Sequence, residues 1–321
     1  MIRILANDGL AEDAVRMLES QGWTVDVGPV PAEALPERLK DYDVLIVRSA
    51  TKVTGQLLRQ NPHLKVVARA GVGLDNIDLG TARELGIRVI NTPGASAPSV
   101  AELTLAHMMA IFRFLHLSMR EMPEVRESSH FKALKKKYSK GREVSGKTLG
   151  LVGMGRIAQE VARRAVGLGM RVRYHDPMVE KVELALEQLG IRPVPIISLA
   201  SEPLEKVLAE SDVVSLHLPL TEETRHLIDF DRLRMMKKGA YLIQCARGGI
   251  VDEEALLKVL DEGHLAGAGL DVFEDEPHPR PILLAHPKIS VTPHIGASTV
   301  EAQQRIGLDL ARQLIALLSE A

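Results

Sequence analysis

The sequence has little of the features that mark several specialised classes of protein. Only one of its 321 residues is cysteine, Cys245, so no disulfide can form within the chain. The formal net charge is -2, which gives no overall attraction to nucleic acid or to an anionic membrane. No run of about 18 uncharged apolar residues is present, and residues 2–6 begin the chain as a strand-like segment instead of a signal peptide. We therefore expect a cytoplasmic protein that binds neither nucleic acid nor membrane.

The composition is that of a globular protein with more than one domain. Apolar residues make up 45% and charged residues 26%, and the 25 glycines and 17 prolines are spread along the chain as turn residues. A single core stops growing beyond about 250–300 residues. The length of 321 residues therefore predicts two domains.

Short apolar runs alternate with longer segments of helical period, which is typical of parallel strands joined by crossover helices. The first half of the chain contains five such runs, at residues 2–6, 24–27, 44–47, 66–68 and 89–90. Residues 11–21 have the pattern of an amphipathic helix. This half predicts a flavodoxin-like lobe of the α/β class with a doubly wound parallel sheet.

A cluster of proline, glycine and serine at residues 91–98 predicts the end of this lobe. Ser99 and Glu102 then have the spacing of a capping box, and we expect a long helix from Val100 to about Met119. Its apolar residues cover more than the single stripe that a small core requires. The helix is either the interface of a homodimer or a helix buried within one domain.

The second half predicts six further parallel strands with helices between them, as in a Rossmann domain. They lie at residues 147–152, 171–175, 213–216, 240–244, 266–270 and 289–291. Ser298 and Glu301 repeat the capping-box spacing and open a helix to about Leu318, which we interpret as returning to the first lobe. The predicted domains are a discontinuous substrate-binding lobe, residues 1–96 and 297–321, and a Rossmann domain, residues 97–296.

A glycine-rich loop follows the first strand of the second series and precedes a predicted helix, which is the context of a dinucleotide-binding loop. Gly153 permits a tight turn, Gly155 lets the backbone approach a pyrophosphate, and Ala158 allows the helix to pack closely on the strand. The N-terminus of the helix offers N–H groups to phosphates. The residues that we expect at the pyrophosphate are Gly153, Gly155, Arg156, Ile157 and Ala158.

The choice of dinucleotide depends on Asp176, which ends the next predicted strand at about the 20-residue distance expected for the acid that binds ribose hydroxyls. No arginine directly follows Asp176 to pair with a 2′-phosphate, so NAD is favoured over NADP. The alternative is a glycine turn with an unrelated surface aspartate. A second glycine pair, Gly71 and Gly73, fails as a pyrophosphate loop because Asn76 stands where a small residue is required. It still follows a strand, at the edge where such sheets bind ligands.

Three polar side chains that follow predicted strands suit the oxidation of a 2-hydroxy acid. Arg247 can hold a carboxylate with its planar guanidinium. His294 can take the hydroxyl proton because imidazole titrates near neutral pH. Glu276 can orient that imidazole, although the sequence alone leaves open which acid of residues 274–276 points inward. The alternatives are a surface arginine, a structural histidine and a solvated acidic loop.

Five motifs follow one another along the second half: Gly-x-Gly-x-x-Ala with Asp176, His217-Leu218-Pro219-Leu220-Thr221, Cys245-Ala246-Arg247-Gly248-Gly249, Leu270-Asp271-Val272-Phe273 and Pro293-His294-Ile295-Gly296-Ala297. In this order they resemble the NAD-dependent D-2-hydroxyacid dehydrogenase family. The resemblance implies that Arg247, Glu276 and His294 are the catalytic residues. It also implies that further contacts to NAD come from His217, Leu218, Pro219, Cys245, Ala246, Arg247, Asp271, His294, Gly296 and Ala297. Cys245 is then a small pocket residue and not a nucleophile, and no metal is assigned.

Residues 47–54, 69–76 and 99–103 are similar to the phosphoglycerate dehydrogenase branch of that family. This resemblance implies oxidation of D-3-phosphoglycerate to 3-phosphohydroxypyruvate, in serine biosynthesis. The implied substrate contacts are Arg48, Ser49, Gly71, Val72, Gly73 and Arg247. Arg48, Ser49 and Lys52 form a cationic turn that suits a phosphate, the alternative being a solvated loop.

Two departures from that branch leave other substrates open. The printed sequence ends after the last predicted helix, so we expect no C-terminal regulatory domain and no serine feedback through one. Residues 132–142 are basic but lack a tryptophan common there in the family, and we interpret them as a solvated loop or as cations lent to a neighbouring subunit's phosphate site. The alternative substrates are glyoxylate, hydroxypyruvate or another 2-oxo acid. An NAD-sensing corepressor is a third possibility, because such relatives retain the same three residues.

Overall fold

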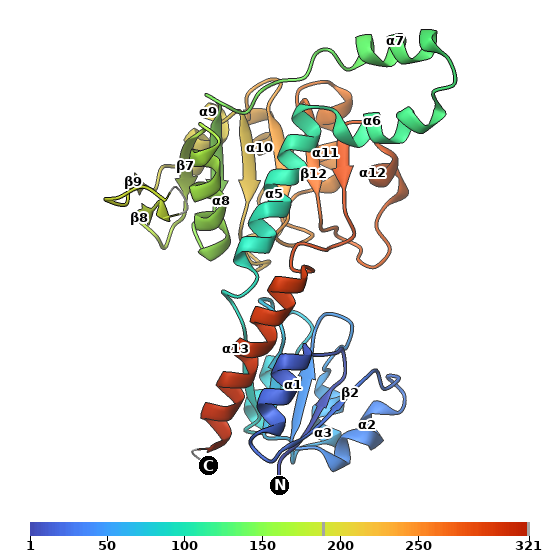
Figure 1. Ribbon diagram of the computed structural model, residues 1–321, viewed down its shortest axis with the longest axis vertical. Helices are drawn as coiled ribbons and strands as arrows, with labels where there is room; N and C mark the ends of the chain where they lie inside the picture. Colours follow the sequence, from blue (N-terminus) through green and yellow to red (C-terminus); the bar gives the residue numbers. More distant parts are fainter. Residues whose placement is uncertain (188–189, 320–321) are drawn as a thin grey trace. The chain divides into compact units, whose positions relative to one another are not determined.

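The structure is a computed structural model that describes residues 1–187 and 190–319. The chain divides into two compact units, which are shown in Figure 1. Unit 1 consists of Met1–Ser99 with Ala297–Ala321, and unit 2 consists of Val100–Gly296. The first boundary between the two units thus falls after Ser99, three residues beyond residue 96, where we expected the first lobe to end.

Unit 1 is built on a sheet of five parallel strands in the order β2-β1-β3-β4-β5. The strands are β1 (Arg3–Ala6), β2 (Thr24–Val27), β3 (Val44–Val47), β4 (Val66–Arg69) and β5 (Arg88–Asn91). The helices are α1 (Glu12–Glu19), α2 (Leu35–Arg38), α3 (Gly55–Gln60), α4 (Leu79–Glu84) and α13 (Val300–Ser319), with a 3-10 turn at Leu39–Asp41. This strand order confirms the flavodoxin-like prediction. It also puts the reversal of strand order between β1 and β3, the position at which such sheets bind ligands.

The sheet of unit 1 is covered on both faces, which is why its central strand β3 is apolar and buried along its whole length. One face packs against α1 and α13, and the other against side chains from α2, α3 and α4. Gly307 of α13 meets α1 so closely that an added Cβ would lie 3.0 Å from the Cβ of Ala14. The close packing of α13 on α1, visible in Figure 1, accounts for the return of the chain to its first lobe.

Unit 2 contains a sheet of six parallel strands in the order β13-β12-β11-β10-β6-β7, which confirms the second predicted series. The strands are β6 (Thr148–Val152), β7 (Arg171–His175), β10 (Val213–Leu216), β11 (Tyr241–Gln244), β12 (Gly267–Leu270) and β13 (Ile289–Val291). Helices α8 (Arg156–Gly167), α9 (Leu204–Glu210), α10 (Phe230–Met235), α11 (Glu253–Asp261) and α12 (Pro281–Ala285) connect them. Strand order reverses between β6 and β10, so the ends of these two strands and their neighbours define the binding edge.

The long helix expected from Val100 to about Met119 is instead two helices, α5 (Ala97–Phe112) and α6 (Leu115–Glu121). Phe114 between them has φ 56°, a left-handed conformation that interrupts the helical ladder. Within residues 1–187 and 190–319, no single helix is both long and apolar enough to cross a membrane. Among the described residues, α5 taken with residues 115–124 meets the length and composition together, and this pair is bent by 67°.

The two capping boxes predicted from sequence are also wrong in detail. Helix α5 begins at Ala97, so Ser99 lies inside its first turn. At the other helix, the Oγ1 atom of Thr299 accepts the N–H of Ala302 at 3.2 Å, and Thr299 therefore caps α13 where we expected Ser298. Serine and threonine both favour such positions, so adjacent candidates are not separated by composition alone.

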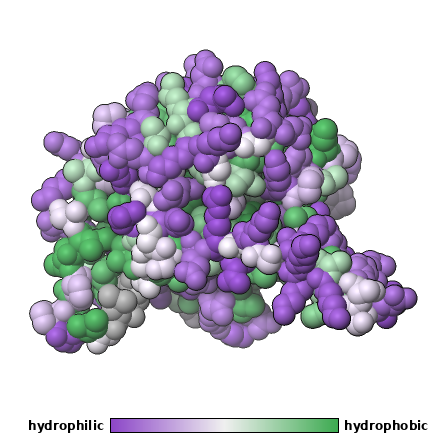
Figure 2. All heavy atoms as spheres, turned by 90° about the horizontal axis from the view of Figure 1, so that it is seen from above, coloured by the Kyte–Doolittle hydropathy of each residue, from purple (hydrophilic) through white to green (hydrophobic). Residues whose placement is uncertain are grey.

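Two local elements were not predicted at all. The basic run that we interpreted as a loop is helical up to Lys137, as α7 (Ser128–Lys137), with its lysines exposed. After Asp176, strands β8 (Lys181–Ala185) and β9 (Ile196–Ala200) form an antiparallel hairpin. The hairpin leaves the large apolar side chains of Met178, Ile191 and Ile196 exposed, and Figure 2 shows an apolar patch on this side of the molecule.

Candidate active site

The glycine-rich loop joins β6 to α8 and has the geometry that a pyrophosphate requires. Gly153 has φ 89°, and an added Cβ there would lie 2.5 Å from the backbone oxygen of His217. Gly155 is exposed, and apart from its two chain neighbours no described residue has an atom within 4 Å of the position of its missing Cβ. Ala158 is completely buried against the sheet. No described side chain caps the N-terminus of α8, so its N–H groups are available to an anion.

Asp176 ties the end of β7 to this loop. Its Oδ2 atom accepts the N–H of Met154 at 2.7 Å, while its Oδ1 atom accepts the N–H groups of Met178 at 2.8 Å and Val179 at 3.1 Å. A carboxylate has about four acceptor sites. The contacts made within the protein therefore leave acceptor capacity for the hydroxyls of a ribose.

Further predicted NAD contacts follow β10 and β11, at the binding edge of the sheet. His217, Leu218 and Pro219 follow β10, and desolvation lowers the pKa of His217 to about 3, so its imidazole is neutral at pH 7. Cys245 and Ala246 follow β11 and are both buried. Burial, followed by the nearby charge of Asp271, raises the pKa of the Cys245 thiol far above its ordinary value. Cys245 is thus a small buried residue without thiolate character.

Arg247 lies in a turn that is fixed from both sides. The side chain of Gln244 donates to the Arg247 backbone oxygen at 2.9 Å and accepts the N–H of Ala246 at 3.1 Å. An added Cβ on Gly248 would lie 1.8 Å from the backbone oxygen of Phe273. Only glycine allows this approach, and it brings the Arg247 turn against the loop that follows β12.

Glu276 is the acid of that loop which faces the predicted base. Its Oε1 atom accepts the N–H of Phe273 at 3.0 Å, and its Oε2 atom lies 2.7 Å from Nδ1 of His294. Burial alone would raise the pKa of the Glu276 carboxyl, but the hydrogen bond and charge of His294, the Phe273 N–H and the charge of Arg247 hold it below the ordinary value. Glu276 is therefore ionised at neutral pH.

His294 itself has an unusual backbone conformation, φ 53° in a residue that is not glycine. Its turn is held by Asp271, a residue that is only 1% exposed. Asp271 accepts the N–H of Ile295 at 2.9 Å and the N–H of Gly296 at 2.8 Å. It therefore supports the turn instead of presenting its carboxylate at a surface. Backbone strain of this kind persists where surrounding contacts overdetermine it, often at functional sites.

A buried histidine behind this turn was missed in the sequence. His107 of α5 lies 2.9 Å from Oγ1 of Thr292 and 3.0 Å from Oγ of Ser290, and Thr292 donates to Asp271 at 2.6 Å. Burial lowers the pKa of His107. Its position within an apolar helix gave no signal that distinguished it from a core residue.

The predicted substrate turn of unit 1 follows β3. Asp8, after β1, accepts the N–H of Arg48 at 2.6 Å and both the N–H and the hydroxyl of Thr51, at 3.1 and 2.6 Å. The amide of Asn76 donates to the backbone oxygens of Arg48 at 2.8 Å and Thr51 at 2.7 Å. Asn76 stands where a pyrophosphate loop would have a small residue, and its side chain instead holds the turn of Arg48 and Thr51 by these hydrogen bonds. Ser49 is exposed in the same turn.

The second predicted segment, at Gly71 to Gly73, follows β4. Gly71 is buried with φ 151°, and an added Cβ would overlap the guanidinium of Arg69. Val72 is held by the Asn91 amide, which donates to its backbone oxygen at 2.6 Å. Arg69, at the end of β4, is a second cation at this edge, in addition to Arg48, and it is not among the substrate contacts that we expected.

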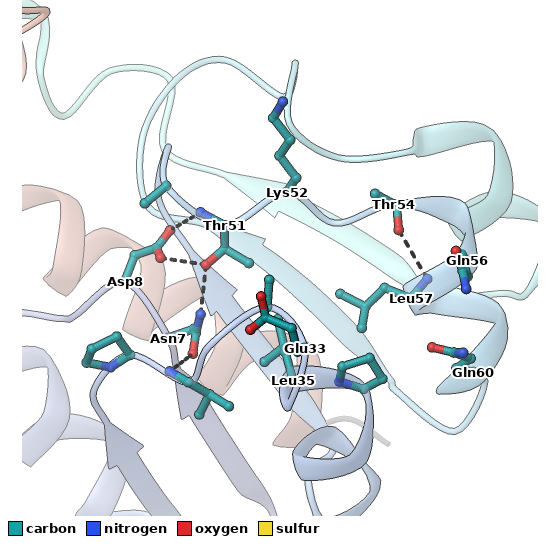
Figure 3. Close-up of a pocket in the computed structure, with 15 residues that line it drawn as sticks. Asn7, Asp8, Glu33, Leu35, Thr51, Lys52, Thr54, Gln56, Leu57 and Gln60 are labelled. Atoms are coloured by element: carbon teal, nitrogen blue, oxygen red, sulfur yellow. Dashed lines mark hydrogen bonds between the residues drawn. The ribbon is translucent and has the colours of Figure 1, made fainter. Parts of the chain in front are cut away.

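Two cavities open at the edges of unit 1. One of about 690 Å³ is lined by Arg48 together with residues from the N-terminal ends of α1 and α13, including Glu12, Asp13, Ser298 and Thr299. The other, of about 670 Å³, lies beside Asn7, Asp8 and Thr51, and Figure 3 shows Asn7 and Asp8 turned toward Thr51. Both cavities border the turn that carries Arg48.

The remaining predicted residues fall where the two units divide. Gly296 is the last residue of unit 2, and Ala297 belongs to unit 1. Within residues 1–187 and 190–319, no group of three or more histidine, cysteine, aspartate or glutamate side chains is arranged to hold a metal ion.

Known proteins are similar to this chain over most of its length. The family model described as "D-isomer specific 2-hydroxyacid dehydrogenase, NAD binding domain" matches residues 105–296. The hydroxypyruvate reductase of Thermotoga maritima is 42% identical over 316 residues, 97% of this chain and 97% of that protein. The D-3-phosphoglycerate dehydrogenase of Methanocaldococcus jannaschii is 43% identical over 314 residues, 98% of this chain but 57% of that protein. This chain therefore spans little more than half of the latter's length.

A solved structure extends the similarity to three dimensions. The NAD+-bound 3-phosphoglycerate dehydrogenase of Entamoeba histolytica superposes with a TM-score of 0.79 at 29% sequence identity. The match covers 99% of this chain and 95% of that one.

Proposed function

The chain belongs to the D-isomer specific 2-hydroxyacid dehydrogenase family and has its NAD-binding domain, and from this we propose that it oxidises D-3-phosphoglycerate at C2 to 3-phosphohydroxypyruvate. The observation that supports the chemistry most strongly is the pair of Glu276 and His294, joined at 2.7 Å. The loop that carries Glu276 also lies against the turn of Arg247, because Gly248 of that turn contacts the backbone of Phe273.

In this proposal each of the three side chains has one task. The guanidinium of Arg247 binds the substrate carboxylate and fixes the direction of C2. His294 donates its Nδ1 proton to Glu276, which leaves Nε2 to take the proton of the C2 hydroxyl. The ionised Glu276 then stabilises the imidazolium that forms. NAD, when bound, accepts the hydride that leaves C2, so the products are the 2-oxo acid, NADH and a proton.

The residues that hold NAD in this proposal are those whose geometry fits a dinucleotide. Gly155 and the uncapped N-terminus of α8 receive the pyrophosphate, because the backbone there is open to a close approach. Asp176 accepts the ribose hydroxyls with the acceptor sites that its backbone contacts leave over. A 2′-phosphate would meet this carboxylate, which favours NAD over NADP.

The choice of phosphoglycerate depends on unit 1. Arg48 lines a cavity with Ser298 and Thr299, at the N-terminal end of a 20-residue helix that favours an anion. Within the described residues the Arg48 guanidinium has no hydrogen-bond or ion-pair partner, so it is available to a phosphate. The similarity to the Methanocaldococcus jannaschii dehydrogenase supports the same choice.

A second candidate is the reduction of hydroxypyruvate or glyoxylate, which lack the phosphate. It is favoured by Glu12 and Asp13, whose carboxylates line the cavity of Arg48 and pair with Arg16. The similarity to the Thermotoga maritima reductase over 97% of both chains also favours it. The proposed chemistry at Arg247 and His294 would be the same for either substrate.

A substrate panel tests the proposal. D-3-phosphoglycerate and D-glycerate are assayed with NAD and NADP, and hydroxypyruvate and glyoxylate with NADH and NADPH. We expect NAD to be preferred and kcat/KM for phosphoglycerate to exceed that for D-glycerate at least about tenfold, since a charge-assisted hydrogen bond contributes about 1.5–3 kcal/mol. Equal values would favour the reductase. Binding of NAD without turnover of any of the four acids would overturn the enzymatic proposal and favour a sensor.

The partner in this proposal is a second copy of the chain. Helix α6 and the turn after it expose the apolar side chains of Leu115, Met119 and Met122, with Met119 74% exposed, and α7 adds Phe131. Apolar side chains gathered on neighbouring helices favour burial against another subunit. Analytical ultracentrifugation should show that the wild type is a dimer. The Met119→Asp dimer should dissociate at a higher protein concentration. A monomeric wild type would contradict this assignment.

A further inference from the structure

The loop that carries Glu276 is fastened to the start of α11 by two reciprocal hydrogen bonds. Glu274 donates its N–H to Oε1 of Glu253 at 2.8 Å, and Glu253 donates its N–H to Oε1 of Glu274 at 3.3 Å. Glu253 is the first residue of α11 and is only 4% exposed. The two glutamates thus join the loop to the helix through both side chains and both backbones.

A third residue connects the same carboxylate to the Arg247 turn. The Nε2 atom of His226 lies 3.0 Å from Oε1 of Glu274, and the backbone N–H of His226 donates to the oxygen of Gly249 at 2.7 Å. His226 has φ 49°, so its backbone adopts a conformation that few residues other than glycine accept. One residue therefore touches both the turn that presents Arg247 and the loop that presents Glu276.

The neighbours of Glu253 compensate its burial only in part. The Nε atom of Arg280 lies 3.9 Å from its Oε2, and Arg280 also pairs with the exposed Glu254 at 3.0 Å. A buried carboxyl group is costly unless it is paired and hydrogen-bonded. Burial raises the pKa of the Glu253 carboxyl, the Glu274 N–H and the charge of Arg280 act against this rise, and Oε2 has no hydrogen-bond partner among the described residues. None of the roles proposed for catalysis requires Glu253, so its burial calls for a structural reason.

We propose that Glu253, Glu274 and His226 form a latch that positions Glu276 and, through it, His294. Glu274 is two residues from Glu276 and is adjacent to Phe273, whose N–H holds the Glu276 carboxylate. A displacement of about 1 Å at a reacting group can lower the rate on the order of 100-fold. The three residues are positioning residues, and the inference rests on the function proposed for Glu276 and His294.

Three variants and one control test the latch. Glu253→Ala removes the acceptor for the Glu274 N–H, while Glu253→Gln keeps an oxygen in its place. His226→Asn keeps a residue that tolerates positive φ but withdraws the ring from Glu274. Glu254→Gln is the matched control, because Glu254 is the next residue of the same helix, is exposed, and pairs through its side chain with Arg280 and not with the loop of Glu276. Melting temperature and circular dichroism establish that each variant folds.

We expect Glu253→Ala and His226→Asn to lower kcat about tenfold with the KM for NAD unchanged. Glu253→Gln should recover most of the lost activity, and Glu254→Gln should match the wild type. A folded Glu253→Ala and a folded His226→Asn with wild-type kcat would overturn the latch. A rise in the KM for NAD in proportion to the loss of kcat would also overturn it, since the loss would then be a general one.

Amide hydrogen exchange gives a second measurement that needs no turnover. If the latch holds Glu276, the N–H groups of Phe273 and Glu274 should exchange faster in Glu253→Ala and His226→Asn than in the wild type or in Glu254→Gln. Unchanged exchange in both variants would contradict the latch. Faster exchange in a protein that turns over no 2-hydroxy acid would instead contradict the proposed function and leave the latch supported.

Discussion

Two turns in this molecule are built alike but hold their functional side chains differently. In unit 2, Asp271 follows β12 and accepts two backbone N–H groups and a threonine hydroxyl from the segment after β13. In unit 1, Asp8 follows β1 and accepts two backbone N–H groups and a threonine hydroxyl from the segment after β3. In both, an aspartate after one strand fixes the turn after the neighbouring strand.

The difference lies in the side chain that each turn presents. His294 is joined to Glu276 at 2.7 Å, so the group proposed as acid and base is oriented by the protein itself. The guanidinium of Arg48 has no partner among the residues that the structure describes, and only the backbone of its turn is fixed. The imidazole proposed for the reaction is thus held in position by the protein, whereas the guanidinium proposed to select the substrate is not. This explains why the residues identify the family more firmly than the substrate.

The largest effect is expected when the organised side chain is removed. His294→Asn keeps a residue that accepts φ 53° and removes the base. General acid-base catalysis contributes about 10²- to 10⁴-fold, so kcat should fall by that order. Fluorescence titration should give the same Kd for NADH as the wild type. A variant that retained more than a tenth of the activity would show that another group takes the proton.

Weakening the two supporting aspartates in parallel tests whether the turns have different roles. Asp271→Asn and Asp8→Asn each place an amide NH₂ against backbone N–H groups, and an unsatisfied buried group costs about 1–3 kcal/mol. Both should lower the melting temperature. Asp271→Asn should also lower kcat for every substrate about tenfold or more, whereas Asp8→Asn should leave kcat for hydroxypyruvate within about twofold. A loss of kcat for all substrates in Asp8→Asn would remove the distinction.

The Glu276 carboxylate allows a test through pH. Its pKa in the folded protein is below the ordinary glutamate value of about 4.3. The stability that it contributes is therefore fully present above that ordinary value and is lost as pH falls through the lower folded value. Urea unfolding at several pH values from 6 downward should show that the stability difference between the wild type and Glu276→Gln narrows in acid. A difference independent of pH would contradict the interaction of the Glu276 carboxylate with His294.

Much of the fold could be predicted because its signals are local. Most strands of the two parallel sheets are short apolar runs, the edge strands β2 and β7 being more polar. The observed bounds differ from the predicted ones by no more than one residue at either end. The break between α5 and α6 could not be predicted, since it depends on the left-handed conformation of Phe114 within an apolar stretch. The hairpin of β8 and β9 was missed, and its strands alternate exposed with partly or fully buried residues, unlike the fully buried central strands of the parallel sheets.

The site was predicted less completely, for reasons that lie in long-range contacts. The sequence offered three acids at residues 274–276, and the N–H of Phe273 and the ring of His294 are what distinguish Glu276. Asp271 was expected to contact NAD, and what the sequence did not indicate is that its carboxylate holds the turn of His294. His107 and Asp8 carried no motif, because each acts through partners far away in the chain.

The smallest effect is expected at Cys245, two residues before Arg247. Burial raises the pKa of its thiol, so little thiolate exists at neutral pH. Cys245→Ala should keep kcat within about threefold of the wild type, since the substitution replaces one small buried side chain with another. The native protein should react with iodoacetamide at pH 7 far more slowly than the unfolded chain. Rapid alkylation with loss of activity would mean that Cys245 is more exposed than the structure indicates.

The contrast between the two turns is tested most directly by the ratio of kcat/KM for D-3-phosphoglycerate to that for D-glycerate, measured in the wild type and in Arg48→Ala. If Arg48 selects the phosphate while His294 and Arg247 carry out the reaction, the ratio should fall at least about tenfold in the variant, since a charge-assisted hydrogen bond is worth about 1.5–3 kcal/mol. The value for D-glycerate itself should stay nearly unchanged. An unchanged ratio, or an equal loss for both substrates, would contradict the account.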